Sequence, residues 1–143
     1  MQELALEERR RLNRLVAEAV GFRAEKWGEF DWRLVTPDGR GTGTLCARAE
    51  MVWVNWGPQF TRDMNAWLAW GLPWLSKRLS PSELMWGIWQ GETDNSVEVG
   101  VNDIVTTEAT WEIEGTISDL PLLLCRLVER IVGGDNAETA TNA

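Results

Sequence analysis

The chain has 143 residues, and its 14 Lys and Arg against 22 Asp and Glu give a net charge of −8. It contains no His, which excludes imidazole as a general base, proton shuttle or metal ligand. Two Cys cannot build a Cys/His zinc site without His. With 44% hydrophobic and 25% charged residues, the composition fits one globular domain. We predict a single domain over 1–134 and a disordered tail over 135–143.

The acidic balance argues against a general nucleic-acid binder, because such proteins neutralise phosphates with Lys and Arg. It also argues against docking on an anionic membrane. No apolar run reaches 18 residues, and residues 1–20 are too charged for a signal peptide. We therefore expect a cytoplasmic protein in which Cys46 and Cys125 are reduced thiols.

The N-terminal third predicts one helix and at least one strand. Apolar residues recur at three- and four-residue spacing over 2–20, and Gly21 stands where this helix should end. Alternation over 29–36 predicts a strand, followed by turn residues. The glycine-rich piece 39–43 leads into 45–56, which we interpret as a hairpin or a mobile loop, with Trp53 and Trp56 on opposite faces of a strand.

A central helix is predicted to start at Thr61 and Asp63, an N-cap with an acidic first turn. Its apolar positions continue to Leu79. Pro73 lacks an N–H and would clash with the carbonyl of Ala69, so we expect a break or kink near 71–73.

The C-terminal half predicts three strands and a last helix. Apolar residues fill both faces of 84–90 and alternate with polar ones in 97–101 and 111–117. A helix over about 119–132 follows, with Ser118 as its cap and Pro121 in its first turn. Short consecutive strands between helices predict an α+β fold with a mostly antiparallel sheet and with helices at both ends of the chain.

Two motifs resemble those of one family. The first contains Pro58, Asp63 and Ala66-Trp67, and the second, in the last helix, contains Pro121-Leu122 and Cys125-Arg126. They resemble the helix starts of phage ABA sandwich domain proteins, which are small phage-encoded proteins. The resemblance implies a three-layer α/β/α sandwich and a phage origin, and it implies no catalytic residues. The same residues have a structural alternative, since they begin and pack helices.

The ten Trp residues are the most informative feature of the sequence. Each indole buries about 200 Å² and needs a partner for its N–H, so a small domain should leave several partly exposed. Trp67, Trp70 and Trp74 would form one stripe on an unbroken helix, and Trp86 and Trp89 would lie on opposite faces of a strand. The alternative is that all ten are core residues.

Basic side chains beside the indoles could hold a phosphate or carboxylate. Arg62 is best placed, in the first turn of a helix whose N–H groups attract anions. Exposed charge runs are more often solvated helix faces, which is the alternative for 9–14 and for Lys77-Arg78. The predicted ligand-binding set is Trp56, Arg62, Trp67, Trp70 and Trp74.

Three carboxylates are predicted to share a sheet face. Glu112 and Glu114 alternate on one strand, and Glu98 could lie beside them. They could hold Mg²⁺ or Ca²⁺ or act as an acid/base pair, although alternate Glu more often mark the solvated face. We expect no bound metal and no cofactor.

Two functions remain open, and neither is enzymatic. The first is a phage counter-defence protein that sequesters a nucleotide-type host immune signal by Trp stacking. The second is a protein-interaction module or inhibitor of a host protein, as a homo-oligomer or through an acidic, Trp-rich surface. An enzyme would need metal-bound carboxylates or a thiol without imidazole.

Overall fold

The computed structural model describes residues 4–142, with side chains through residue 133. The contacts within the chain divide it into two compact units. The units comprise residues 1–59 and 60–143, and each has its own antiparallel three-stranded sheet. The predicted α+β class with antiparallel strands is confirmed, and a helix precedes the first sheet and another follows the second. The strands are divided between two sheets, where we expected one. The prediction of a single domain stays a prediction. The expected disorder of 135–143 also stays a prediction, because the structure describes no side chains for these residues.

The first unit begins with helix α1 (Leu6–Val20), which ends at Gly21 as predicted. Gly21 has a φ of 120°, and its N–H donates to the last carbonyls of the helix. This left-handed region suits glycine because it has no Cβ. The Asn13 amide donates to the Gln59 side chain at 3.1 Å, which ties α1 to the end of this unit.

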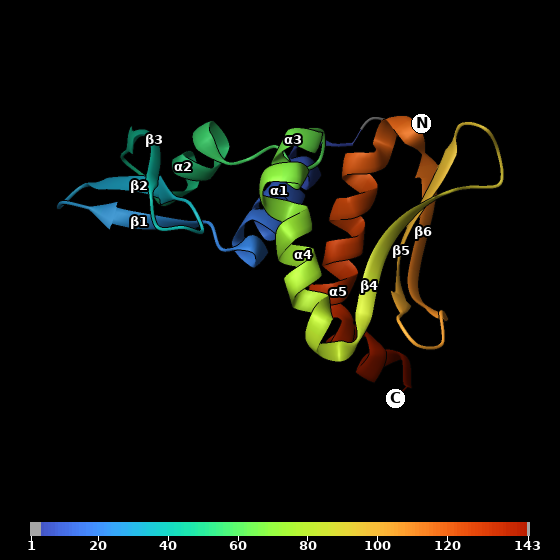
Figure 1. Ribbon diagram of the computed structural model, residues 1–143. Helices are drawn as coiled ribbons and strands as arrows, with labels where there is room; N and C mark the ends of the chain where they lie inside the picture. The colour runs from blue at the N-terminus through green and yellow to red at the C-terminus, as the bar shows by residue number, and fades with distance from the viewer. Residues whose placement is uncertain (1–3, 143) are drawn as a thin grey trace. The chain divides into compact units, whose positions relative to one another are not determined.

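Strands β1 (Arg23–Trp27), β2 (Asp31–Val35) and β3 (Gly41–Cys46) follow in sheet order β1-β2-β3. Helix α2 (Ala49–Trp56) packs against all three of them (Figure 1). The expectation of a strand in the second part of 45–56 is therefore wrong, because this segment forms a helix. On α2, Trp53 and Trp56 lie one turn apart on one side of a helix, not on opposite faces of a strand.

The second unit starts with a helical run of three parts: α3 (Met64–Ala66), the π-helical turn η1 (Trp67–Gly71) and α4 (Leu72–Leu79). The expected irregularity near Pro73 is this π turn. The Leu72 N–H donates to the Trp67 carbonyl, five residues back. The wider turn changes the helical phase just before the proline, which lets the helix continue although Pro73 has no N–H.

Sheet order β4-β5-β6 completes the second unit, with β4 (Leu84–Gln90), β5 (Ser96–Asp103) and β6 (Ala109–Thr116). A 3₁₀ turn, η2 (Ser80–Ser82), precedes β4, and another, η3 (Ile117–Asp119), leads into α5 (Leu120–Asn142). Helix α4 packs against β4, and α5 packs against β5 and β6 (Figure 1).

The core of this unit lies on the helix-facing side of its sheet. Val97, Val99 and Val101 of β5 are buried there, and the Trp86 indole N–H donates to Ser76 Oγ of α4 at 2.7 Å. The helices contribute buried leucine, valine and isoleucine side chains: Leu75, Leu79, Leu123, Leu124, Leu127, Val128 and Ile131. The other side of the sheet carries the alternate residues of each strand.

Every helix in the described part of the chain is too short or too polar to cross a lipid bilayer.

Candidate functional site

Trp67, a member of the predicted ligand-binding set, is a core residue. None of its surface is exposed, its indole N–H donates to the Phe60 carbonyl at 2.8 Å, and its ring meets that of Phe60 edge to face at 5.1 Å. The ring also lies against Gly71, where a Cβ would come within 2.2 Å of it. A ligand therefore has no face of Trp67 to stack on.

The π turn also changes the stripe predicted for Trp67, Trp70 and Trp74. That stripe required an unbroken α-helix, and the wider turn rotates the residues after it relative to those before it. Trp70 and Trp74 are both partly buried.

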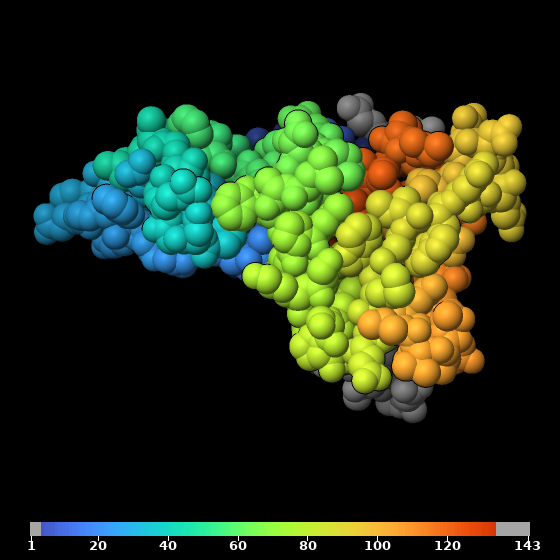
Figure 2. Space-filling model, viewed as in Figure 1, coloured from blue at the N-terminus to red at the C-terminus, as the bar shows by residue number. Residues whose placement is uncertain are grey.

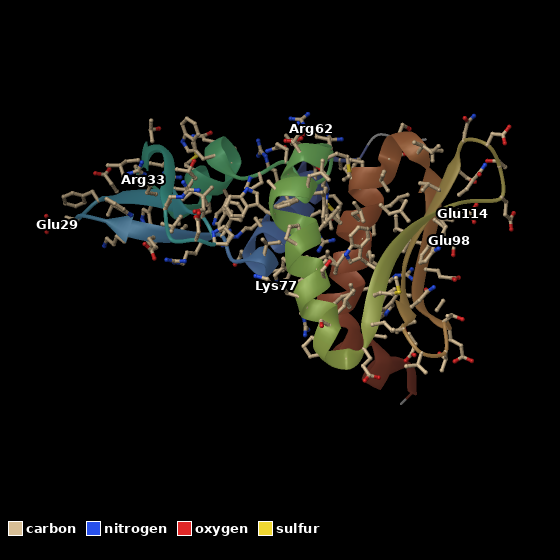
Figure 3. All side chains as sticks on the ribbon, in the orientation of Figure 1. Glu29, Arg33, Arg62, Lys77, Glu98 and Glu114 are labelled. Carbon is tan, nitrogen blue, oxygen red and sulfur yellow. The ribbon has the colours of Figure 1, made fainter. Side chains whose placement is uncertain are left out.

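Arg62 is exposed, and it precedes the helix instead of lying in its first turn (Figure 3). The cap is Asp63, whose carboxylate accepts the Asn65 N–H at 2.9 Å, and Thr61 is buried before it. A carboxylate at this helix end occupies the position that an anionic ligand would need. The predicted phosphate position beside Arg62 thus already carries a negative charge.

Trp56, the fifth predicted residue, belongs to the first unit. Its ring lies over Gly43, where a Cβ would come within 2.3 Å of it, and 42% of the residue is exposed. Gly43 has a φ of 77°, so this strand position favours glycine for its backbone as well. Residues 62–74 of the second unit hold the other four members of the set.

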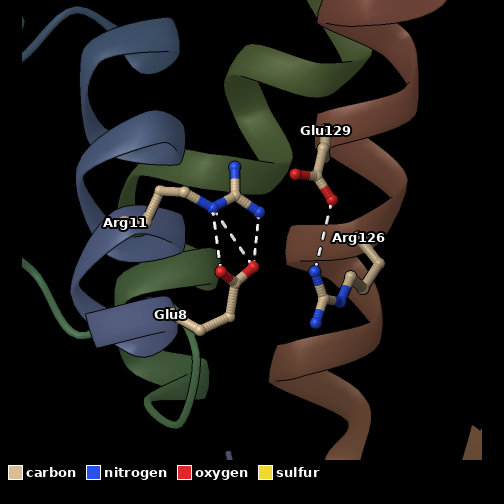
Figure 4. A network of polar contacts seen from close by, with 4 residues as sticks. All are labelled: Glu8, Arg11, Arg126 and Glu129. Atoms are coloured by element: carbon tan, nitrogen blue, oxygen red, sulfur yellow. Dashed lines mark hydrogen bonds and ion pairs between the residues drawn. The ribbon is translucent and has the colours of Figure 1, made fainter. Parts of the chain in front are cut away.

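Several basic groups are paired on their own helices. The Arg11 guanidinium donates to Glu8 on α1 at 3.0 Å, and Arg126 donates to Glu129 on α5 at 3.3 Å (Figure 4). Arg14 donates to Glu18 and also lies 5.2 Å from the centre of the Trp53 ring. The exposed ion pairs of Arg11 and Arg14 agree with the solvated helix face that was the alternative to an anion clamp at these residues.

The outer face of the second sheet carries an indole that the predicted set does not include. Trp89 and Trp86 lie on opposite faces of β4, as predicted, and Trp89 points away from the helices. Its ring lies across Gly87 of its own strand and Gly100 of β5. A Cβ on Gly87 would come within 2.5 Å of the ring. One on Gly100 would come within 3.3 Å of the ring and within 2.6 Å of the Trp111 carbonyl oxygen. We call Gly87, Trp89 and Gly100 the indole seat.

Three carboxylates surround the indole seat. Glu98 is the cross-strand partner of both Trp89 and Glu114, and Glu112 is the partner of Gly100. The strand register confirms the expectation that Glu98, Glu112 and Glu114 share one face. Figure 3 labels Glu98 and Glu114 on this sheet. We call the indole seat and these three carboxylates the acidic indole face.

The carboxylates of this face repel one another. Partial burial raises the pKa of Glu98, and the negative charges of Glu112 and Glu114 raise it further, together with a hydrogen bond to Glu112. The approach of a positive charge therefore lowers the free energy of this face. Within the described residues, no group of three acidic, Cys or His side chains is arranged to hold a metal ion.

Both cysteines are free thiols, as predicted. Cys46 is partly exposed, and Cys125 is buried on α5, where burial raises the pKa of its thiol. A buried, protonated thiol is a poor nucleophile, which leaves Cys125 a packing role.

The register of the sheet creates the indole seat, and this is why the predicted set missed it. The two glycines are 13 positions apart in sequence and become neighbours only because Gly87 pairs with Gly100. The available signal was Gly87 two residues before Trp89, on the same face of one strand.

No protein-family model, curated protein or solved structure matches this chain. The resemblance to phage ABA sandwich domain proteins stays a hypothesis that rests on the two motifs.

Proposed function

We propose that this protein is a non-enzymatic interaction module that binds a basic segment of another protein through the acidic indole face. The observation that carries the proposal is the Trp89 ring, which lies against Gly87 and Gly100 on the sheet face that also carries Glu98 and Glu112. An indole face attracts ammonium and guanidinium groups, and Trp is the best aromatic partner for them. Carboxylates at its border add hydrogen-bond acceptors for the same groups.

The charge of the whole chain supports a basic partner. A net charge of −8 favours the approach of positive surfaces and disfavours nucleotides and other anions. Trp89 is 39% exposed, so part of this residue is open to a partner. Exposed Trp residues are also common binding-energy centres of protein interfaces.

The sequestering of a nucleotide signal has less support as a function. Its stacking set loses Trp67 to the core, and Asp63 places a negative charge next to Arg62. If the motif resemblance reflects a phage origin, the basic segment would belong to a host protein in the host cytoplasm.

A peptide titration tests the proposal. The probe is a peptide of alternating Arg and Val, and binding is followed by calorimetry at low and high salt. We expect binding that weakens with salt, because exposed charge pairs are screened. Trp89→Ala should lower the affinity at least tenfold, which corresponds to about 1.4 kcal/mol.

The matched control is Trp27→Ala, because Trp27 is similarly exposed at 44% but lies on the first sheet with Arg33 5.2 Å from its ring centre. This variant should bind the peptide as the unmodified chain does. Equal losses in both variants, or binding of a cyclic dinucleotide but not of the peptide, would overturn the proposal.

A further inference from the structure

Strand β4 forms an edge of the second sheet. In the order β4-β5-β6 one side of β4 pairs with β5, and the described part of the chain supplies no strand for its other side. The strand reads Leu-Met-Trp-Gly-Ile-Trp-Gln and carries no charge and no proline. Its segment of the chain lies at the visible surface in Figure 2.

Natural sheets normally protect such an edge with charges, proline or a bulge. β4 pairs with β5 over seven residues without a register shift, so no bulge interrupts it. β6, at the opposite edge, carries Glu112 and Glu114 and has a register shift near Val101. The two edges of one sheet thus differ, and only β4 presents an uninterrupted, uncharged backbone.

Two hydrogen bonds determine which backbone groups of β4 face outward. The Gly91 N–H donates to the Ser96 carbonyl at 3.0 Å, and the Ile104 N–H donates to the Glu83 carbonyl at 2.9 Å. In an antiparallel ladder the bonded pairs alternate, so the odd-numbered residues of β4 face β5. The N–H and C=O groups of Trp86 and Ile88, together with those of Leu84 and Gln90, therefore point away from the sheet.

We propose that the partner segment pairs with β4 as a fourth strand of this sheet, which rests on the proposed function of the acidic indole face. Strand addition uses main-chain hydrogen bonds for affinity and alternate side chains for specificity. Neighbouring strands lie about 4.8 Å apart, and every second side chain of the added strand would lie on the same sheet face as Trp89. Lys or Arg at those positions would reach across the indole toward Glu98.

Charge selects a basic partner over a second copy of this chain. Pairing two β4 strands would join two acidic indole faces in one sheet, and each chain brings a net charge of −8. A basic segment instead neutralises the three carboxylates, which repel one another when no positive charge is near.

Amide hydrogen exchange of the unmodified chain tests the proposal directly. Adding the Arg-Val peptide should slow exchange of the Trp86 and Ile88 amides at least tenfold, because their N–H groups become bonded. The same peptide with N-methyl groups at alternate residues keeps its charge but cannot pair along one edge, so it should give neither protection nor full affinity.

A pair of variants separates this inference from the proposed function. Ile88→Pro removes one outward N–H, which an edge strand tolerates, whereas Ile88→Ala removes the side chain and keeps the N–H. We expect a tenfold or larger loss of affinity for Ile88→Pro and little change for Ile88→Ala. Gln90→Pro, at the end of the strand, is used if circular dichroism shows that Ile88→Pro does not fold.

Each outcome then has one meaning. If Trp89→Ala abolishes binding but the edge amides stay unprotected and the proline variants still bind, strand addition is wrong and the proposed function stands. If neither Trp89 nor β4 affects binding, both are wrong. Edge protection that depends on protein concentration without peptide, with a dimer in light scattering, would identify a second copy as the occupant and overturn the inference.

Discussion

At the scale of single residues, tryptophan in this protein is repeatedly paired with glycine. Trp56 lies over Gly43, Trp67 over Gly71 and Trp89 over Gly87 and Gly100. An indole ring can approach a backbone closely only where no side chain stands between them, and glycine is the residue that lacks a Cβ. The glycines therefore determine where the large side chains can lie.

Gly71 provides the clearest test of this pairing. Gly71→Ala should lower the free energy of unfolding by about 1–3 kcal/mol, because the new methyl group would overlap the buried Trp67 ring. The control is Gly133→Ala on α5, where a Cβ meets nothing within 4 Å. Helix propensity alone predicts that both changes stabilise, by roughly 0.5–1 kcal/mol. Urea unfolding distinguishes the two, and equal shifts would show that Gly71 does not accommodate the ring.

Glu98 gives a prediction of pH dependence. Its pKa is raised in the folded protein, so the folded state binds this proton more readily than the unfolded state does. The stabilising contribution is complete below the ordinary pKa of Glu and is lost as the pH rises through the raised value. Glu98→Gln should therefore stabilise the protein at pH 7 and have little effect at about pH 4.

Urea midpoints across this pH range provide the measurement, with Glu29→Gln in the first unit as the control. Asp38 and Asp103 act in the opposite direction, because hydrogen bonds lower the pKa of each and their stabilisation is lost on acidification. The difference between wild type and Glu98→Gln removes their contribution. A difference that grows as the pH falls would contradict the prediction.

At the scale of elements, the cap of the central helical run has a measurable role. Asp63 accepts the Asn65 N–H and so satisfies one donor at the start of α3. Asp63→Ala should cost about 1 kcal/mol of stability, whereas Asp63→Asn keeps the acceptor and should cost less. Thermal unfolding of both variants measures this, and equal losses would assign the effect to charge instead of capping.

The elements with long, regular patterns were predictable from the sequence. α1, β2, β4, β5 and β6 lie where spacing and alternation predicted them, and α5 begins as predicted. The expected end of α5 near residue 132 is wrong, because the helix continues to Asn142. α2 was not, because Val52 and the aromatic residues beside it favour a strand locally, and packing against the first sheet decides for a helix. β1 reads Arg-Ala-Glu-Lys-Trp and has no apolar alternation to detect.

The candidate site was predictable only in part, because alternation along a strand is visible in the sequence but the pairing of strands is not. Facing carboxylates follow from alternation along strands, so Glu98, Glu112 and Glu114 could be grouped from the sequence. The indole seat requires the pairing of Gly87 with Gly100, which is a tertiary property. The burial of Trp67 likewise depends on Phe60 and on the π turn.

At the scale of the whole molecule, the number of indoles exceeds what the core accommodates. Among the described residues, only Trp53 and Trp67 are buried, and Trp27, Trp56 and Trp89 are each about two-fifths exposed. The expectation that several tryptophans remain partly exposed is confirmed. The partly exposed rings occur in both units, so this property belongs to the chain as a whole.

Acrylamide quenching of the intrinsic fluorescence should show this distribution. We expect most of the emission to be quenchable in the folded protein, with a smaller protected fraction from the buried rings. Trp67→Phe should reduce the protected fraction, and Trp89→Ala the quenchable one. Emission that resists acrylamide almost completely would mean that the rings are covered in solution.

The position of Trp89 on two strands also aligns them. If β5 slipped by one residue along β4, Val99 or Val101 would come beneath the indole in place of Gly100, and a branched side chain leaves no room for the ring. The same slip would turn Glu98 of β5 toward the helices, since neighbouring residues of a strand face opposite ways. A single solvent-side ring thus holds the two strands to one alignment from the side opposite the core.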